Sequence, residues 1–336
     1  MFTNVRLLAS DKIPFFSIVI LYWNSKEFIL ECLEALRKQT DQDFEIIILD
    51  NGSLMPIERK VLENYSTLQI NCYRLENNIG FAAGNNHAIQ YTSGKYLVLL
   101  NADAFPEPEW LMNVRKGICK YPDCFFSSKL IMANNPERYD GKGDVYHFSG
   151  LAWRKAYNAV VQNCNDTETQ VFSACGAAAI YPKEAFTRSG GFDPDYFSYF
   201  EDVDLGFRLR LIGYKCYFLP DAVVKHIGSG STGTKSDFSV YFGHRNLVWT
   251  YFKNMPGLLF WALLPFHVGA NLLQVFSYLL RKRGRVTIRA KADALKGIVK
   301  ILQKRKEIQQ SRVVPISSII RIMNWNPIAP FLKVKR

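Results

Sequence analysis

The chain has 336 residues, of which 48% are hydrophobic and 14% aromatic. This composition supplies a sizeable core and excludes a disordered chain. The net charge of +12 comes from the tail, because residues 281–336 contain 16 Lys/Arg and 2 Asp/Glu, which leaves −2 for residues 1–280. A nucleic-acid binder would carry basic and aromatic residues together on its folded platform. The slightly acidic larger part of the chain therefore argues against nucleic acid as a partner.

The N-terminal segment predicts a β-α-β unit. Phe16–Tyr22 is apolar except at Ser17, as expected for a strand that is buried on both faces of a parallel sheet. Apolar residues then recur at helical spacing, and residues 45–49 supply the next strand. A connection of this kind crosses over right-handed and makes a parallel pair. Further strands are predicted over residues 68–73 and over Tyr96–Leu100.

Polar residues stand where the apolar runs end. Asp50 follows the second strand, Asn101 and Asp103 follow Tyr96–Leu100, and His226 follows a later apolar run. Since ligands of open α/β sheets bind beyond the carboxyl ends of the strands, these side chains are expected to line one site. A glycine-punctuated loop at residues 77–86 opens a short helix, whose free N–H groups suit an anion.

Taken in order, these stretches resemble those of glycosyltransferase family 2, whose members have the GT-A fold. The resemblance spans roughly residues 15 to 250 and rests on segments 17–20, 23–24, 49–53, 78–86, 101–103, 190–193 and 200–205, with Arg208 and His226. It implies an α/β chain with a mostly parallel central sheet flanked by helices, assigned to residues 1–240. Residues 241–336 are predicted to form a helical, basic, membrane-associating extension. Within the family, the sequence is most similar to bacterial rhamnosyltransferase-like enzymes of surface-polysaccharide synthesis.

The resemblance assigns one group of residues to the nucleotide of a sugar donor. Asp50 corresponds to the family residue that hydrogen-bonds the pyrimidine ring. The other residues predicted to contact the donor are Tyr22, Trp23, Asn24, Asn78, Gly80, Asn101 and Ala102. A plainer alternative exists, because Asn-Gly sequences form turns and aromatic pairs at strand ends pack in cores. The donor is expected to be a dTDP-linked deoxysugar such as dTDP-rhamnose.

Asp103 is predicted to bind a divalent metal, Mg²⁺ or Mn²⁺. Release of a nucleoside diphosphate places negative charge on the leaving phosphate, which such a cation neutralises, and a carboxylate oxygen is a suitable ligand. By resemblance, His226 occupies the position of a further metal or diphosphate contact. The common motif of the family is Asp-x-Asp, whereas this chain has Asn101 at the first position, so weaker metal binding is expected. The alternatives are a turn carboxylate for Asp103 and a structural histidine for His226.

Glu201 and Asp202 are predicted to carry the catalysis. Two adjacent carboxylates beneath apolar side chains have raised and separated pKa values, as general-base work at neutral pH requires. By resemblance, Asp202 removes the proton of the acceptor hydroxyl, Glu201 orients the acceptor, and the anomeric configuration inverts. Acidic residues also favour the first turn of any helix, which is the alternative.

Arg245 is predicted to clamp a pyrophosphate through its guanidinium. The alternative is an ordinary arginine on a helix surface. Residues 228–233 are predicted to form a lid.

Residues 256–280 are apolar over a length that could cross a membrane. His267, Asn271, Gln274 and Tyr278 nevertheless form one polar stripe of a helix, so the segment is predicted to lie on the membrane or to re-enter it. A true span and a soluble core helix are the alternatives. Basic residues that follow would bind an anionic leaflet. The chain is therefore expected at the cytoplasmic face of the inner or plasma membrane, where it would act on a lipid-linked or glycan acceptor.

The combined prediction is an inverting glycosyltransferase of cell-surface glycan synthesis. Two alternatives stay open at this point. One is a transferase of the same family that uses a UDP-sugar. The other is a non-catalytic GT-A-like assembly subunit, which Asn101 favours. No pattern in the sequence selects an oligomeric state.

Overall fold

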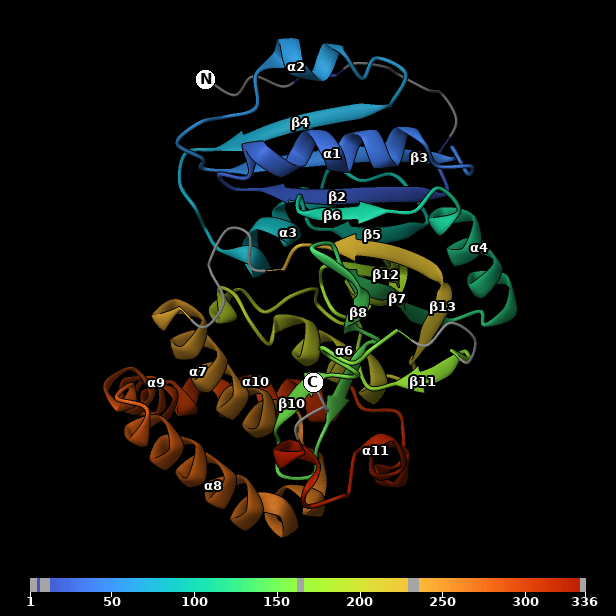
Figure 1. Cartoon of the computed structure of the whole chain (residues 1–336). Helices are drawn as coiled ribbons and strands as arrows, with labels where there is room; N and C mark the ends of the chain where they lie inside the picture. Colours follow the sequence, from blue (N-terminus) through green and yellow to red (C-terminus); the bar gives the residue numbers. More distant parts are fainter. Residues whose placement is uncertain (1–4, 7–12, 162–165, 229–235, 333–336) are drawn as a thin grey trace.

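The computed structural model describes residues 5–6, 13–161, 166–228 and 236–332. In this part of the chain a central sheet carries helices on both faces, and the helices of the C-terminal region lie at one end (Figure 1). The strand order is β1-β4-β3-β2-β5-β12-β7-β13-β11, with β6 paired to β13 and β8 to β7, while β9 and β10 form a small separate sheet. The strands are β1 (Val5–Arg6), β2 (Phe16–Tyr22), β3 (Phe44–Asn51), β4 (Ile70–Leu75), β5 (Tyr96–Leu100), β6 (Ala104–Pro106), β7 (Cys124–Met132), β8 (Asn135–Gly141), β9 (Asp144–Tyr146), β10 (Ala152–Arg154), β11 (Thr169–Val171), β12 (Ala178–Pro182) and β13 (Lys215–His226).

The predicted β-α-β unit forms the parallel half of the sheet. β2 pairs in parallel with β3 and with β5, and β3 pairs in parallel with β4. The predicted strands Phe16–Tyr22 and Tyr96–Leu100 coincide with β2 and β5, whereas the strand predicted over residues 68–73 is β4, displaced by two residues. Beyond β5 the sheet is mixed, because β12 runs antiparallel to both β5 and β7 while β13 is parallel to β7.

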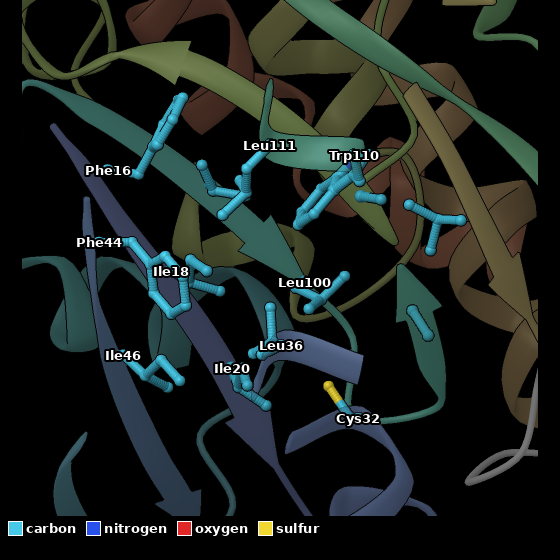
Figure 2. Close-up of a cluster of buried hydrophobic side chains, with 14 of the residues drawn as sticks. Phe16, Ile18, Ile20, Cys32, Leu36, Phe44, Ile46, Leu100, Trp110 and Leu111 are labelled. Carbon is cyan, nitrogen blue, oxygen red and sulfur yellow. The ribbon is translucent and has the colours of Figure 1, made fainter. Parts of the chain in front are cut away.

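Helices cover both faces of the sheet. One face packs against α1 (Lys26–Arg37) and α4 (Trp110–Lys120), and the other against α3 (Phe81–Ile89), α5 (Lys183–Arg188) and α6 (Glu201–Leu211). Ile18 and Ile20 of β2 belong to the first core, which Figure 2 shows together with Leu36 and Trp110, and Val19 belongs to the second. The strand is therefore apolar on both faces except at Ser17 near its start, whose hydroxyl donates to the Glu45 carboxylate at 2.7 Å. α2 (Arg59–Glu63) is a short helix in the connection from β3 to β4.

The C-terminal helices pack against the side of α6 that faces away from the sheet. They are α7 (Asp237–Asn254), α8 (Gly257–Leu280), α9 (Gly284–Lys296), α10 (Ile298–Gln310) and α11 (Ile316–Ile322), and the short 3₁₀ segments are η1 (Pro194–Tyr196) and η2 (Ala329–Phe331). Phe207 of α6 shares a core with Tyr251 of α7 and Leu263 of α8. The division predicted at residue 240 falls inside α7, so α6 and α7 join the two predicted regions directly.

Buried ion pairs reinforce this junction. Lys253 on α7 is 1% exposed, and its Nζ lies 2.7 Å from Asp193 and 2.8 Å from Asp204. Asp204 also pairs with Arg208 at 2.8 Å, and Asp193 with Lys304 at 2.5 Å. Each buried carboxylate thus contacts two cations, which offsets the cost of removing these charges from water.

Candidate active site

A cavity of about 800 Å³ opens beyond the carboxyl ends of β2, β3 and β5. Its lining comes from the segments that follow these strands, the start of α3, the β9–β10 hairpin, the segment before α6 and the start of α7. The predicted site residues that line it are Trp23, Asn78, Gly80, Asn101, Ala102, Asp103, Glu201, Asp202 and His226. The structure therefore brings together side chains that are separated by up to two hundred positions in the sequence.

Tyr22, Asn24 and Asp50 do not line the cavity; they build the turn after β3. The Asp50 carboxylate accepts a backbone N–H at 2.8 Å, the Tyr22 hydroxyl donates to a carbonyl at 3.0 Å, and the Asn24 side-chain oxygen accepts an N–H at 2.9 Å, all within residues 53–55. The second Asp50 oxygen lies 3.6 Å from the Arg74 guanidinium. These three residues thus shape the wall of the cavity from behind.

Asn51 belongs to the motif 49–53 but was predicted only to form a turn; in the structure it lines the cavity and fixes the glycine loop. Its Nδ2 donates to Asn78 Oδ1 at 3.0 Å and to the Gly80 carbonyl at 3.2 Å, and its Oδ1 accepts the N–H of Ile79 at 3.0 Å. Gly80 has φ of +89°, and a Cβ there would lie 2.6 Å from the ring of Phe197. Only glycine meets both conditions, so the loop and the segment before α6 approach closely at this point.

Asp103 and His226 form a donor pair that fits a divalent cation. His226 Nε2 lies 3.4 Å from Asp103 Oδ1, and Nδ1 lies 2.7 Å from Asp140 Oδ2. A carboxylate on the far ring nitrogen is the usual support of a metal-binding histidine. Burial lowers the pKa of His226, but its hydrogen bonds to Asp103 and Asp140 outweigh this and raise the pKa above the ordinary value. A bound cation would take the place of that proton.

Asn101 adds an amide to this pair, since its Nδ2 lies 3.4 Å from His226 Nε2. Among the described residues, no group of three or more His, Cys, Asp or Glu side chains converges as a complete metal site. Asp103 and His226 would therefore leave the other coordination positions to phosphate oxygens and water, as is common for Mg²⁺ bound with a nucleotide.

The carboxylates Glu201 and Asp202 begin α6 and line the same cavity. Asp202 accepts the N–H of Gly176 at 3.0 Å and that of Val203 at 2.8 Å, which fixes its orientation. Burial raises the pKa of Asp202 in spite of these hydrogen bonds. Burial and the Asp202 charge hold the pKa of Glu201 well above its usual range, and Glu201 Oε2 has no hydrogen-bond partner among the described residues. The pKa values of both carboxyl groups are therefore raised, that of Glu201 more strongly, which suits acid–base chemistry.

Three polar residues on β8, β9 and β10 join the site without any sequence signal. Asp144 and Arg154 line the cavity, and Arg154 Nη1 donates to Asp140 Oδ2 at 2.5 Å. Asp140 therefore links this arginine to His226. Burial and the charge of Asp202 raise the pKa of Asp144 to about 8. The strands β9 and β10 have three residues each, too few for a periodic pattern, so only the fold reveals their place.

Arg245 is not among the residues that line the cavity. Its guanidinium donates to the backbone carbonyls of Asp195 and Tyr196 at 2.7 and 3.0 Å, and it lies 4.1 Å from the centre of the Trp249 ring. In the structure the side chain is thus committed to the protein rather than directed at a phosphate. Of the predicted lid, residues 229–233 lie outside the described part of the chain.

The fold and the cavity define a class of enzyme. A parallel half-sheet with a glycine loop, an Asp–His pair at the strand ends and a carboxylate at the start of α6 in the same cavity are the features of a GT-A glycosyltransferase. The family model described as glycosyl transferase family 2 matches residues 17–188, just over half of the chain. The chain belongs to this family and is a glycosyltransferase.

Curated relatives include two rhamnosyltransferases. The N-acetylglucosaminyl-diphospho-decaprenol L-rhamnosyltransferase of Mycobacterium tuberculosis is 23% identical over 248 residues, which cover 67% of this chain and 78% of that protein. Rhamnosyltransferase WbbL of Escherichia coli K12 is 24% identical over 220 residues, covering 60% of this chain and 80% of WbbL.

Solved structures support the fold. S. aureus TarS 1-349 in complex with UDP-GlcNAc is 16% identical, covers 91% of this chain and 90% of its own, and has a TM-score of 0.58. The mannosyltransferase PcManGT from Pyrobaculum calidifontis, in complex with GDP-Man and Mn²⁺, is 16% identical with a TM-score of 0.55, over 93% of this chain and 84% of that one. The likeness extends beyond the segment matched by the family model into the C-terminal helices.

Proposed function

We propose that this glycosyltransferase moves a sugar from a nucleoside-diphosphate donor to a hydroxyl group, with inversion at the anomeric carbon, in cell-surface glycan synthesis. The observation that carries the proposal is the cavity itself. It holds the Asp103–His226 pair and the Glu201–Asp202 pair within one enclosure, together with the glycine loop. A dTDP-linked deoxysugar such as dTDP-rhamnose is the proposed donor, in line with the two rhamnosyltransferase relatives. A UDP-sugar is the alternative donor.

The nucleotide would occupy the side of the cavity formed by the ends of β2, β3 and β5. Trp23 and Asn78 line this side, with Gly80 at the start of α3, and Asp50 supports it through the turn after β3. The N–H groups at the start of α3 favour an anion such as the diphosphate. A divalent cation held by Asp103 and His226 would neutralise the charge that develops on the leaving phosphate.

Asp202 is the proposed general base. Its carboxylate takes the proton of the acceptor O–H group, the freed oxygen bonds to the anomeric carbon, and the bond from that carbon to the phosphate oxygen breaks. The electron pair leaves with the nucleoside diphosphate. Attack from the face opposite the diphosphate inverts the configuration. A pKa raised by burial makes Asp202 a stronger base than an exposed carboxylate, and Glu201 would orient the acceptor with its unpaired oxygen.

We further propose that the enzyme works at the cytoplasmic surface of a membrane on a lipid-linked or glycan acceptor. Among the described residues α8 is the one helix long and apolar enough to cross a membrane, with a mean hydropathy of 1.5. Its polar stripe turns inward: His267 is buried, stacks 4.0 Å from Tyr251 and hydrogen-bonds the Ser149 carbonyl at 2.8 Å. Its outer face exposes large apolar side chains, namely Leu258, Trp261, Phe266, Leu272, Leu273, Phe276 and Leu280.

This arrangement favours a helix that lies in the membrane surface over one that crosses it. A spanning helix would need lipid contact around most of its circumference, whereas α8 packs against α7 and α9 and exposes one apolar face. Three basic residues follow α8 directly and are all exposed, namely Arg281, Lys282 and Arg283. Such residues attract an anionic leaflet, by about 1 kcal/mol each.

A donor screen tests the proposal. The purified protein is incubated with dTDP-rhamnose, other dTDP-sugars and UDP-sugars, with and without MnCl₂, in the presence of extracted lipid-linked acceptors. Mass spectrometry then reads transfer and donor hydrolysis, and NMR of the product reads the anomeric configuration. We expect transfer from one donor class, enhanced by Mn²⁺. Inertness toward every donor, in a protein that still binds the nucleotides, would overturn the proposal and favour the non-catalytic assembly subunit.

A further inference from the structure

The segment just before the catalytic carboxylates has an unusual backbone. Phe197, Tyr199 and Phe200 have φ of 63°, 68° and 68°, in the left-handed region. That region is unfavourable for any residue with a Cβ, and bulky side chains adopt it only where the surroundings leave no other choice. Three aromatic residues within four positions do so here. Phe200 is the N-cap of α6, so this segment sets the direction in which Glu201 and Asp202 point.

Asn246 on α7 supplies most of the restraint. Its Nδ2 donates to the carbonyls of Tyr196, Ser198 and Tyr199 at 2.9, 2.9 and 2.7 Å, and the residue is completely buried. One amide group thus reaches three carbonyls within four positions of the irregular segment, so its two N–H groups are shared among them. The Tyr196 carbonyl also accepts the N–H of Ser198 at 2.7 Å. Asn246 therefore adds a buried side-chain donor to a segment in which the backbone N–H groups do not form a regular helical ladder, and loss of such a donor from a buried carbonyl is costly.

Arg245 extends the same restraint. Its guanidinium donates to the carbonyls of Asp195 and Tyr196, and its Nε donates to Asn246 Oδ1 at 2.9 Å. On the other side of the segment, the Phe197 carbonyl accepts the N–H of Ala82 on α3 at 3.1 Å. The segment is therefore fixed between α7 and the start of α3, which borders the proposed nucleotide site.

We propose that Asn246, assisted by Arg245, is a positioning residue that holds segment 196–200 in its irregular conformation, with three residues at positive φ, and thereby aims Asp202 at the acceptor hydroxyl. The role of Asp202 as the base rests on the proposed function. The restraint acts through the backbone, and Asn246 does not line the cavity, so its role needs no contact with substrate or metal. It also gives Arg245 a role other than the pyrophosphate clamp that the sequence motif predicts.

Asn246→Ala is the main test variant, because alanine keeps the helix and removes only the amide. Misplacement of a catalytic group by an ångström lowers turnover by roughly 10²-fold, and a loss of this order in kcat is expected. Affinity for dTDP and UDP, measured by calorimetry with MnCl₂, should stay within about threefold of wild type. Asn113→Ala is the matched control, since Asn113 on α4 donates its amide to one backbone carbonyl at 2.8 Å and does not line the cavity. Its kcat should not change.

Arg245→Gln separates positioning from phosphate binding, and it is the second test variant if Asn246→Ala folds poorly. Positioning predicts a lower kcat with unchanged dTDP and UDP affinity, whereas a phosphate clamp predicts a loss of affinity of tenfold or more. Hydrogen–deuterium exchange of the peptide that covers residues 196–204 provides a readout independent of activity: it should accelerate in both variants and not in Asn113→Ala. If wild type transfers no sugar, the proposed function fails and exchange alone decides. The proposal would be overturned if the variants kept the wild-type turnover per folded molecule, if Arg245→Gln lost affinity for the nucleotides, or if hydrogen–deuterium exchange of the segment did not change.

Discussion

Substitution of Asp202 by asparagine separates chemistry from binding at this site. Asparagine has the shape of aspartate but cannot take up the proton of the acceptor hydroxyl. General-base assistance contributes roughly 10²–10⁴-fold to rate, so turnover should fall by at least 10²-fold, or about 2.7 kcal/mol in activation free energy. The nucleotide side of the cavity is formed by other segments, so affinity for dTDP and UDP should be retained.

The fold should tolerate the substitution. The Asp202 oxygens accept two backbone N–H groups, from Gly176 at 3.0 Å and Val203 at 2.8 Å, and an amide offers one acceptor oxygen in place of two. The lost hydrogen bond costs about 1 kcal/mol. In compensation, the neutral amide avoids the cost of burying a charged carboxylate, which is the cost that raises the pKa of Asp202. The free energy of unfolding should therefore change by no more than about 1 kcal/mol.

Steady-state transfer followed by mass spectrometry, across a range of pH, measures both effects. In wild type kcat/KM should fall as the pH drops through the raised pKa of Asp202, because the base must be unprotonated. That limb should be absent from Asp202→Asn. Asp221→Asn, an exposed aspartate outside the cavity, is the control and should behave as wild type. A turnover within threefold of wild type in Asp202→Asn would refute the assignment of the base.

Three other variants, the last a double substitution, test the electrostatics and the proposed membrane surface. Because the pKa of Asp144 is about 8 in the fold, its stabilising effect is complete below its unfolded pKa, near 4, and is lost as the pH rises toward 8. The free energy of unfolding of Asp144→Asn, measured in urea, should therefore rise relative to that of wild type by roughly 2–4 kcal/mol from pH 5 to pH 8; an equal difference at both pH values would contradict this. Lys253→Met should destabilise by about 3 kcal/mol, the lower end for a broken buried pair, because both carboxylates keep a second cation; a loss under about 1 kcal/mol would be inconsistent. Leu272→Gln with Phe276→Gln, at 66% and 60% exposure, should weaken sedimentation with anionic vesicles at least about tenfold, while Leu54→Gln, at 89% exposure, should not.

The sequence predicts the framework well because the framework depends on local patterns. β2 and β5 were found to the residue, since strands covered on both faces are apolar at nearly every position. The polar residues after those strands could be grouped in advance, because the carboxyl ends of parallel strands meet at one edge of the sheet. The predicted residues Asp103, Asp202 and His226 all line one cavity in the structure.

What the sequence could not supply depends on long-range contacts. Asp144 and Arg154 enter the cavity on two three-residue strands that carry no periodic signal. For Arg245, a motif identifies the residue but not the partners of its guanidinium, which are carbonyls some fifty positions earlier in the chain. The inward turn of the α8 polar stripe likewise depends on His267 meeting Ser149 across the molecule.

The position of α6 links the chemistry to the C-terminal helices. Leu205 and Leu209 pack toward the sheet, whereas Phe207 packs toward α7 and α8, and Asp202 is carried on the first turn. Removal of the chain after Asn254 would uncover this second core, so a truncated protein would lose its fold, its activity and its vesicle binding together. Substitutions on the outer face of α8 change the proposed lipid contact and leave the α6 packing intact. They are therefore the alterations that can separate membrane binding from catalysis.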